Sequence, residues 1–146
     1  MTNNIKKDIR TLSVEHLKVF FESNNIEAYR ANQVHEWLWI KGVFDFNQMT
    51  NLSIDFRKFL QKHFTINNIK VESIQKSIDG TIKNAVKLYD NKIVESVLIP
   101  TKNRITACIS SQVGCSLNCK FCATSKLKRL RNLNVDEIFD QVKFCL

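Results

Sequence analysis

The chain has 146 residues, of which 44% are hydrophobic and 25% charged, with one proline and three glycines. This is the composition of a globular protein, and it excludes the disordered and fibrous classes. No run of about 18 apolar residues occurs, which excludes a transmembrane helix. The polar start MTNNIKKDIR is not followed by the apolar segment of a secretory signal. We therefore expect a cytoplasmic protein with no membrane partner.

The net charge is +8 and the sequence pI is about 9.4. An excess of basic residues favours a polyanionic partner, above all RNA or DNA. Many small basic proteins nevertheless bind nothing specific. The charge alone therefore leaves both interpretations open.

Residues 1–66 are predicted to form a small helical domain. Ser13 is suited to cap a first helix and Ser53 a third, and a second helix is expected from Ala28 to Lys41. The aromatic side chains of these helices are expected in a core and not on a surface that stacks RNA bases. They are Phe20, Phe21, Trp37, Phe56 and Phe59.

From Ile69 onward the pattern changes to short β-strands. Asp79-Gly80 and Asp90-Asn91 are turn signals between successive strands. A further strand is expected from Arg104, directly before the cysteine-rich loop. Residues 67–103 are therefore predicted to be a β-hairpin connecting segment.

A last helix is expected after Asn134, with Glu137 three residues on as in a capping box. Its apolar face is expected to contain Ile138, Val142 and Cys145. Residues 104–146 then form a single β/α unit, which cannot cover both faces of its strand alone. We therefore expect this sequence to be the front part of a longer protein.

Four of the five cysteines lie within fifteen residues, and three follow the spacing C-x-x-x-C-x-x-C: Cys115, Cys119 and Cys122. In a reducing compartment, clustered thiols favour a metal, a cluster or catalysis over disulfides. A closed zinc site usually needs four ligands, and the fourth would have to be Cys108, Cys145 or a distant histidine. Three thiolates on a short loop suit a cubane iron–sulfur cluster with one iron left open, because clusters with protein ligands alone use four cysteines.

The motif C-x-x-x-C-x-x-C after a strand resembles that of radical S-adenosylmethionine enzymes. The segments VESVLIP, CISSQVGC, FCAT, RNL and EIFDQV, with YRANQVHEWLW and MTNLS nearer the N-terminus, resemble the RlmN family from about residue 10 onward. Val113 favours this family over a close relative that has a cysteine at this position. The resemblance implies an α/β fold, in which a helical RNA-binding domain and a β-hairpin segment precede the first β/α unit of a partial (β/α) barrel, the radical S-adenosylmethionine core.

The resemblance also implies an activity, the methylation of carbon 2 of adenosine in 23S rRNA and tRNA. Its cofactors would be S-adenosylmethionine and a [4Fe–4S] cluster on Cys115, Cys119 and Cys122. One S-adenosylmethionine methylates an enzyme cysteine, and a second supplies the radical that activates that methyl group. Glu95 matches the family's proton acceptor, and Cys108 matches the cysteine that resolves the protein–RNA adduct. An electron donor such as flavodoxin and a monomeric state are further implications.

The predicted strand around Glu95 gives separate evidence on whether this residue can act as a base. Strand alternation places it on one face with Ile93, Val97 and Ile99. A carboxylate among apolar neighbours can act as a general base, and the alternative is an edge-strand glutamate that faces solvent. For Cys108, alternation does not separate a buried residue from a reactive thiol.

Five basic residues surround the cysteine loop: Lys120, Lys126, Lys128, Arg129 and Arg131. They are expected either to contact RNA phosphates or to form a solvated basic loop. The family usually has glycine at the positions of Ser125 and Lys128, so these replacements bear on the shape of the loop and not on the ligand set.

The methyl-carrying cysteine of the family has no counterpart in this sequence, since Cys145 does not match it. The 146 residues alone are therefore expected to be inactive. Two alternatives remain beside an RNA methyltransferase: a non-catalytic basic RNA-binding module, and a zinc-stabilised structural domain.

Overall fold

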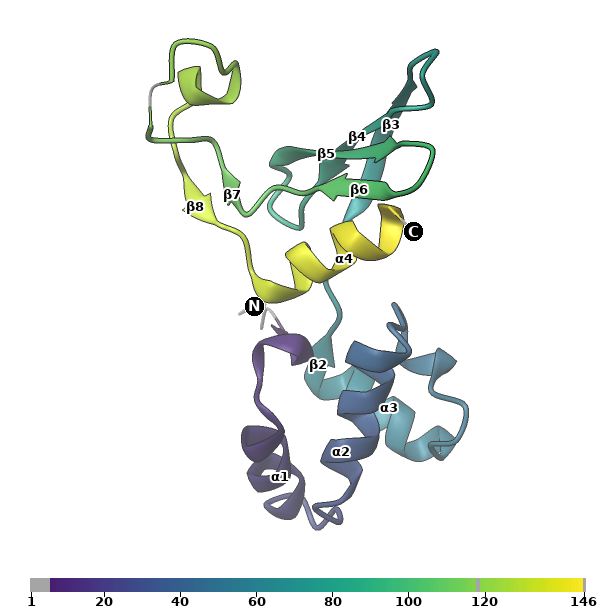
Figure 1. Cartoon of the computed structure of the whole chain (residues 1–146). Coiled ribbons are helices and arrows are strands. Elements are labelled where there is room, and N and C mark those ends of the chain that lie inside the picture. The colour runs from purple at the N-terminus through teal and green to yellow at the C-terminus, as the bar shows by residue number, and fades with distance from the viewer. Residues whose placement is uncertain (1–5, 118, 146) are drawn as a thin grey trace. The chain divides into compact units, whose positions relative to one another are not determined.

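The computed structural model describes residues 6–117 and 119–145 of the chain, which divides into two compact units, Met1–Asn67 and Asn68–Leu146 (Figure 1). The first unit is mainly helical, and the second is an antiparallel sheet with one helix against it. Within the described part, no helix is long and apolar enough to cross a membrane. The mixed α/β fold expected from the sequence is confirmed.

Three helices build the first unit, close to the expected positions. They are α1 (Val14–Glu22), α2 (Arg30–His35), which continues as a π-helical turn over Glu36–Ile40, and α3 (Ile54–His63); short 3-10 turns cover Ile9–Thr11 and Phe46–Gln48. Ser13 Oγ accepts the backbone N–H of His16 at 3.2 Å, and Ser53 Oγ accepts that of Phe56 at 3.3 Å. Both predicted caps therefore form and fix where α1 and α3 begin.

Aromatic side chains fill the core of the first unit. Phe21 is fully buried and meets Phe56 edge-on, with 5.4 Å between the ring centroids. Phe20, Trp37 and Phe59 are partly buried and pack against this core. The prediction that these rings form a core is confirmed, and their burial supplies much of the hydrophobic stabilisation of the unit.

The two ends of the first unit are tied together by hydrogen bonds between the buried side chains of Asp8 and Arg10 and the backbone of Asn67. β1 (Lys7–Asp8) runs parallel to β2 (Phe64–Thr65). The Asp8 carboxylate accepts the backbone N–H groups of Arg10 and Asn67 at 2.8 and 2.7 Å, and the Arg10 guanidinium donates to the Asn67 carbonyl oxygen at 2.7 Å. Asp8 and Arg10 are each only 6% exposed. The sequence pattern did not predict this closure, because its partners are almost sixty residues apart.

Four strands form the sheet of the second unit: β3 (Lys70–Lys76), β4 (Ile82–Lys87), β5 (Ile93–Pro100) and β6 (Ile105–Cys108). They are antiparallel neighbours in chain order. The two predicted turns are confirmed, with positive φ angles of 85° at Gly80 and 63° at Asn91. The register of β3 on β4 shifts between Val71 and Ser73, which marks a β-bulge.

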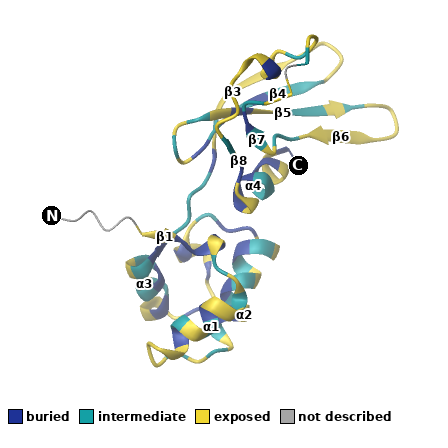
Figure 2. Ribbon diagram, turned by 90° about the vertical axis from the view of Figure 1, so that its left-hand side faces the viewer, coloured by how far each residue is buried: buried dark blue, intermediate teal, exposed yellow. Residues whose placement is uncertain are grey.

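Among the described residues of the second unit, one face of this sheet is covered by a helix and the other carries exposed side chains. Helix α4 (Val135–Cys145) lies along the covered face, as Figures 1 and 2 show. The core between them contains Val86 and Val94 of the sheet, with Val113, Leu133 and Ile138. On the opposite face, Ile93 and Ile99 are 54% and 39% exposed.

The predicted apolar face of α4 is partly wrong. Cys145 is buried and Ile138 is partly buried, but Val142 is exposed. The most deeply buried positions of the helix carry polar residues, among them Glu137 and Gln141 at 1% and 0% exposure. Polar side chains tolerate such burial only when their hydrogen bonds are satisfied, and both find partners in the segments that flank the cysteine loop.

We expect Asp8→Ala to destabilise the first unit by about 2–4 kcal/mol, because it strips two buried N–H groups of their acceptor and leaves Arg10 without its carboxylate. Urea unfolding followed by the fluorescence of Trp37 and Trp39, which both lie in this unit, measures the change. Glu27→Ala removes an exposed carboxylate and serves as the control. Equal unfolding midpoints for the two variants would contradict the role of Asp8.

Candidate functional site

The cysteine loop begins and ends at a short two-stranded stem. β7 (Gln112–Val113) pairs with β8 (Arg131–Asn132) in antiparallel register. The Leu130 N–H donates to the Val113 carbonyl oxygen at 2.9 Å, and the Cys115 N–H donates to that of Leu127 at 3.0 Å. The chain between the two strands is therefore closed at its base by backbone hydrogen bonds.

Gly114 is the tightest point of the stem. Its φ is 73°, and a Cβ atom there would lie 2.2 Å from the carbonyl oxygen of Lys128. No other residue type fits this position without moving the backbone. Among the residues that the structure describes, only Asn25 and Asn91 combine a side chain with a positive φ. Ser125 and Lys128 thus do not have a positive φ, so neither position requires glycine. The two sides of the loop come too close for a side chain at Gly114.

The loop carries Cys115, Cys119 and Cys122 as free, partly exposed thiols. The Leu117 N–H donates to Cys115 Sγ at 3.4 Å, and the Cys122 N–H donates to the Cys119 carbonyl oxygen at 3.2 Å. Over residues 6–117 and 119–145, no three side chains of metal-binding type are gathered as a ligand set. The structure thus places the three predicted ligands on one loop but does not bring their sulfur atoms together.

The two remaining cysteines lie elsewhere in the second unit. Cys145 is buried in α4, and its thiol donates to Ser96 Oγ at 3.7 Å. Cys108 is exposed at the end of β6. A fourth ligand for a closed metal site is therefore not provided by Cys145 in this arrangement.

Arg131 at the end of the stem binds two carboxylates. Its guanidinium donates to both oxygens of Glu137 at 2.7 and 2.8 Å and to Asp90 Oδ2 at 2.9 Å, and it lies over the Tyr89 ring at 5.2 Å. The hydrogen bonds that the guanidinium donates to Glu137, and then to Asp90, raise the pKa of Arg131, and the hydrogen bond from Arg131 holds the pKa of Asp90 below its usual range. Arg131 and Asp90 are therefore both charged at neutral pH.

Arg131 thereby connects three segments. Asp90 belongs to the turn between β4 and β5, and Glu137 to the first turn of α4, where it also accepts the Asn134 N–H at 2.8 Å. A capping box was predicted here, and in it the Glu137 side chain accepts the backbone N–H of the N-cap residue Asn134. This bond is present. The sequence identified Asp90 only as a turn residue. An acidic turn residue gives no local sign of a partner 41 positions away.

Gln141 fixes the segment between Cys108 and the stem. Its amide donates to the Ser110 carbonyl oxygen and accepts the Ser110 N–H, both at 2.9 Å, as a neighbouring strand would. The Ser110 hydroxyl donates to the Glu95 carbonyl oxygen at 2.8 Å. The backbone after Cys108 is therefore held to α4 by the Gln141 amide and to β5 by the Ser110 hydroxyl. Sequence reasoning missed this role.

Glu95 and Cys108 lie on the same face of the sheet. Val97 on β5 pairs with Cys108 on β6, and directly paired residues share a face. Glu95 is two residues from Val97, so it is a diagonal neighbour of Cys108 on that face. Lys83 on β4 also pairs with Val97, and its ammonium lies 3.1 Å from Glu95 Oε1.

The face that Glu95 was predicted to share with Ile93, Val97 and Ile99 is confirmed by the pairing, but the described residues do not bury the carboxylate among these neighbours. The Glu95 side chain is 57% exposed, and β5 is an inner strand, not an edge. The side chain faces outward because α4 occupies the opposite side of the sheet. Its strand neighbours Ile93 and Ile99 are exposed with it.

A cavity of about 100 Å³ lies where this sheet meets the cysteine loop. Glu95 of β5, Ser110 and Gly114 of the connection, and Thr124 and Leu127 of the loop are among its lining residues. The backbone that carries Glu95 and the loop that carries the thiols thus border one space. Of the predicted site residues, Glu95 lines this cavity, whereas the four cysteines do not.

Basic side chains extend from the loop into solvent. Lys120, Lys126, Lys128 and Arg129 are exposed, and Arg129 donates to Asn132 Oδ1 at 2.7 Å. Arg131 is the exception among the five predicted phosphate contacts, because Asp90 and Glu137 already occupy its guanidinium. It therefore acts in the stem and not as a free surface cation.

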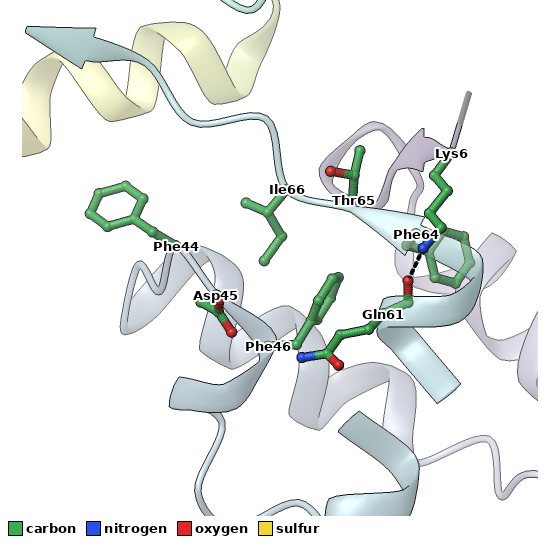
Figure 3. A pocket seen from close by; sticks show the side chains of 8 residues that line it. All are labelled: Lys6, Phe44, Asp45, Phe46, Gln61, Phe64, Thr65 and Ile66. Carbon is green, nitrogen blue, oxygen red and sulfur yellow. Dashed lines mark hydrogen bonds between the residues drawn. The ribbon is translucent and has the colours of Figure 1, made fainter. Parts of the chain in front are cut away.

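A second cavity, of about 270 Å³, lies within the first unit (Figure 3). Phe44, Phe46 and Phe64 form aromatic walls, and the Lys6 ammonium donates to the Gln61 carbonyl oxygen. Its lining contains neither thiol nor imidazole groups. This cavity therefore lacks the chemistry of the loop and is not the candidate site.

We expect Arg131→Met to destabilise the second unit by about 2–3 kcal/mol, because it leaves the buried Glu137 carboxylate without a cation. Arg129→Met removes a nearby exposed arginine and should change stability by less than about 0.5 kcal/mol. Hydrogen exchange of α4 and β5 peptides measures both, since the tryptophans report only on the first unit. Equal protection in the two variants would show that Arg131 does not anchor the stem.

Comparisons with known proteins cover nearly the whole chain. Residues 3–66 match the family model described as ribosomal RNA large subunit methyltransferase N-terminal domain. Proteins named probable dual-specificity RNA methyltransferase RlmN from Flavobacterium johnsoniae and Christiangramia forsetii are 59% and 61% identical over 137 residues, which is 94% of this chain and 39% of each relative. A dual-specificity RNA methyltransferase RlmN from Geotalea uraniireducens is 44% identical over 94% of this chain and 40% of its own length.

The chain therefore spans about two fifths of the length of the curated relatives that it matches. A crystal structure of a radical SAM methyltransferase from Sphaerobacter thermophilus is similar with a TM-score of 0.79 and 29% sequence identity. The similarity covers 95% of this chain and 41% of that chain. Family model, relatives and fold agree with the resemblance carried by the segments around Glu95 and the cysteine loop. In sequence and fold the chain corresponds to about two fifths of an RlmN-family protein.

Proposed function

We propose that this chain carries the cluster ligands and two catalytic residues of a radical S-adenosylmethionine RNA methyltransferase, which methylates carbon 2 of adenosine in 23S rRNA and tRNA. The main support is one observation: three free thiols lie on a closed loop that borders the same cavity as Glu95. The relatives named dual-specificity RNA methyltransferases support the substrate class. The 146 residues alone are proposed to be inactive, because they lack a counterpart of the methyl-carrying cysteine.

Cys115, Cys119 and Cys122 would hold a [4Fe–4S] cluster. The donor set fits, since three partly exposed thiols can each bind one iron and leave a fourth for the amino and carboxylate groups of S-adenosylmethionine. When bound, the cluster supplies the electron that cleaves S-adenosylmethionine. The Leu117 N–H on Cys115 Sγ is a contact of the kind that tunes the potential of such clusters. An electron donor such as flavodoxin is part of the proposal.

Glu95 and Cys108 would act on the RNA from the exposed face of the sheet. Glu95 accepts the proton that leaves the adenosine, and Cys108 resolves the protein–RNA adduct. Their diagonal placement across β5 and β6 allows both to reach one substrate. Lys83 orients the Glu95 carboxylate through its 3.1 Å ion pair. The same ammonium is placed to approach an RNA phosphate.

RNA would be held in part by electrostatic contacts beside the cysteine loop. The exposed side chains of Lys120, Lys126, Lys128 and Arg129 can bind phosphates beside the cysteine loop. Residues 1–66 are proposed to act as an accessory RNA-binding domain, residues 67–103 as the β-hairpin segment, and residues 104–146 as the start of the radical S-adenosylmethionine core. The enzyme is proposed to act as a monomer in the cytoplasm.

We expect anaerobic reconstitution of the chain to bind iron and sulfide, at about four irons per chain, with the broad brown absorbance of a cubane cluster. Serine at Cys115, Cys119 or Cys122 should each abolish this absorbance. Cys145→Ala should keep it, because that thiol is buried in α4. Stoichiometric zinc without sulfide would instead favour a zinc-stabilised domain.

We expect Glu95→Gln to lower methylation by two or more decades, because the amide keeps the shape of the side chain but cannot take up a proton. Cys108→Ala should accumulate a protein–RNA adduct. Both substitutions should be made in the longest protein that the coding sequence encodes. C2-methyladenosine is then measured by nucleoside mass spectrometry. Each variant should bind as much iron as the parent protein. Turnover at the parent rate in both would overturn the two roles, and RNA binding without methylation by the parent would favour a non-catalytic module.

A further inference from the structure

Ser125 lies at the centre of the turn that carries two of the three thiols. It is only 7% exposed, although the loop around it is largely open to solvent. Its Oγ atom lies 2.5 Å from the Cys119 carbonyl oxygen and 2.6 Å from that of Cys122. Its backbone N–H also donates to the Cys122 carbonyl oxygen, at 3.3 Å. One side chain therefore touches the backbone of both cysteines.

The chemistry of this contact is that of a single donor between two acceptors. A hydroxyl has one proton, and the two carbonyl oxygens can only accept it. Both oxygens are held near each other because this proton lies between them and is donated to one or the other. Without the hydroxyl, each oxygen would keep only one backbone donor, and two partial negative charges would face each other at a poorly hydrated point, which is unfavourable. The turn would then open.

The turn sets the relative positions of the two thiols. Cys119 and Cys122 are three residues apart, and the Cys122 N–H donates to the Cys119 carbonyl oxygen at 3.2 Å. Fixing both carbonyl groups fixes the peptide planes next to the two Cα atoms, and with them the directions of the Cβ atoms. Cys115 is fixed separately, by Gly114 and by its own N–H bond to Leu127. The loop thus has two anchors, and Ser125 provides the second.

We infer that Ser125 is a positioning residue, which uses its hydroxyl to hold the backbone of Cys119 and Cys122 in one turn, so that both thiols are presented together to the cluster. The inference rests on the proposed function, because it takes these thiols as cluster ligands. It assigns to the side chain at position 125 a role that a glycine there could not fulfil. Ser125 does not touch the reacting atoms and is not a catalytic residue.

The test compares the wild-type chain with Ser125→Ala, Ser125→Thr and the control Ser116→Ala, which removes an exposed hydroxyl from the same loop. In the metal-free chains, hydrogen exchange of peptides covering residues 119–127 should be about five- to tenfold faster in Ser125→Ala, the effect of losing one buried hydrogen bond. Peptides of β4 and β5 should exchange at the wild-type rate. This contrast separates local positioning from a general loss of stability.

The second measurement uses the reconstituted chains. Loss of iron to a ferrous chelator should be about fivefold or more faster from Ser125→Ala, and Ser125→Thr, which keeps a hydroxyl, should restore slow loss. Equal exchange and equal iron loss in wild type and Ser125→Ala overturn the role of Ser125 and leave the proposed function standing. So does a Ser125→Thr chain that loses iron as fast as Ser125→Ala. A wild-type chain that takes up no iron and sulfide overturns the proposed function, and with it the cluster role of this turn.

Discussion

The ion pairs of Arg131 are the constraint on which the arrangement of the second unit depends. A carboxylate as deeply buried as Glu137 is stable only with a cation and further donors around it, and Arg131 and the Asn134 N–H supply both. Because Asp90 binds the same guanidinium, the β4–β5 turn, the stem and α4 must assemble together. The network lies outside the cysteine loop. The loop can therefore adjust to a ligand without disturbing the core beneath it.

Because the Arg131 network lies outside the cysteine loop, it does not fix the positions of the three thiols. They share one loop but are not gathered as one ligand set. The stem is fixed by Gly114 and by backbone bonds, while the thiols remain partly exposed. Metal binding commonly completes the local order of such sites, since the binding free energy itself stabilises the closed arrangement. A loop that is anchored at its stem and at the turn around Ser125 reduces the entropy that binding must overcome. The sheet face with Glu95 and Cys108 needs no such adjustment, because its register is set by strand pairing.

Local signals in the sequence predicted much of this architecture. Ser13 and Ser53 cap helices through bonds that span three residues, and Asp79-Gly80 forms its turn from its own backbone preferences. The spacing of the cysteines likewise identified the loop. Contacts between distant residues were not predictable in this way. The pairing of Asp8 with Asn67 and the polar buried side of α4 both depend on partners that only the folded chain brings close. Glu95 shows the limit of strand alternation, which identifies its face but not what covers that face.

The bulge in β3 has a consequence for association of the sheet with other chains. β3 and β6 are the two outer strands. The register shift between Val71 and Ser73 interrupts the hydrogen-bonding row of β3, and charged side chains at Lys70, Glu72 and Lys76 accompany it. Irregular, charged edges of this kind discourage pairing with a foreign strand. β6 is short but regular and uncharged from Ile105 to Cys108. The two edges of the sheet therefore differ. An additional strand can pair with β6, whereas the irregular, charged edge at β3 disfavours such pairing.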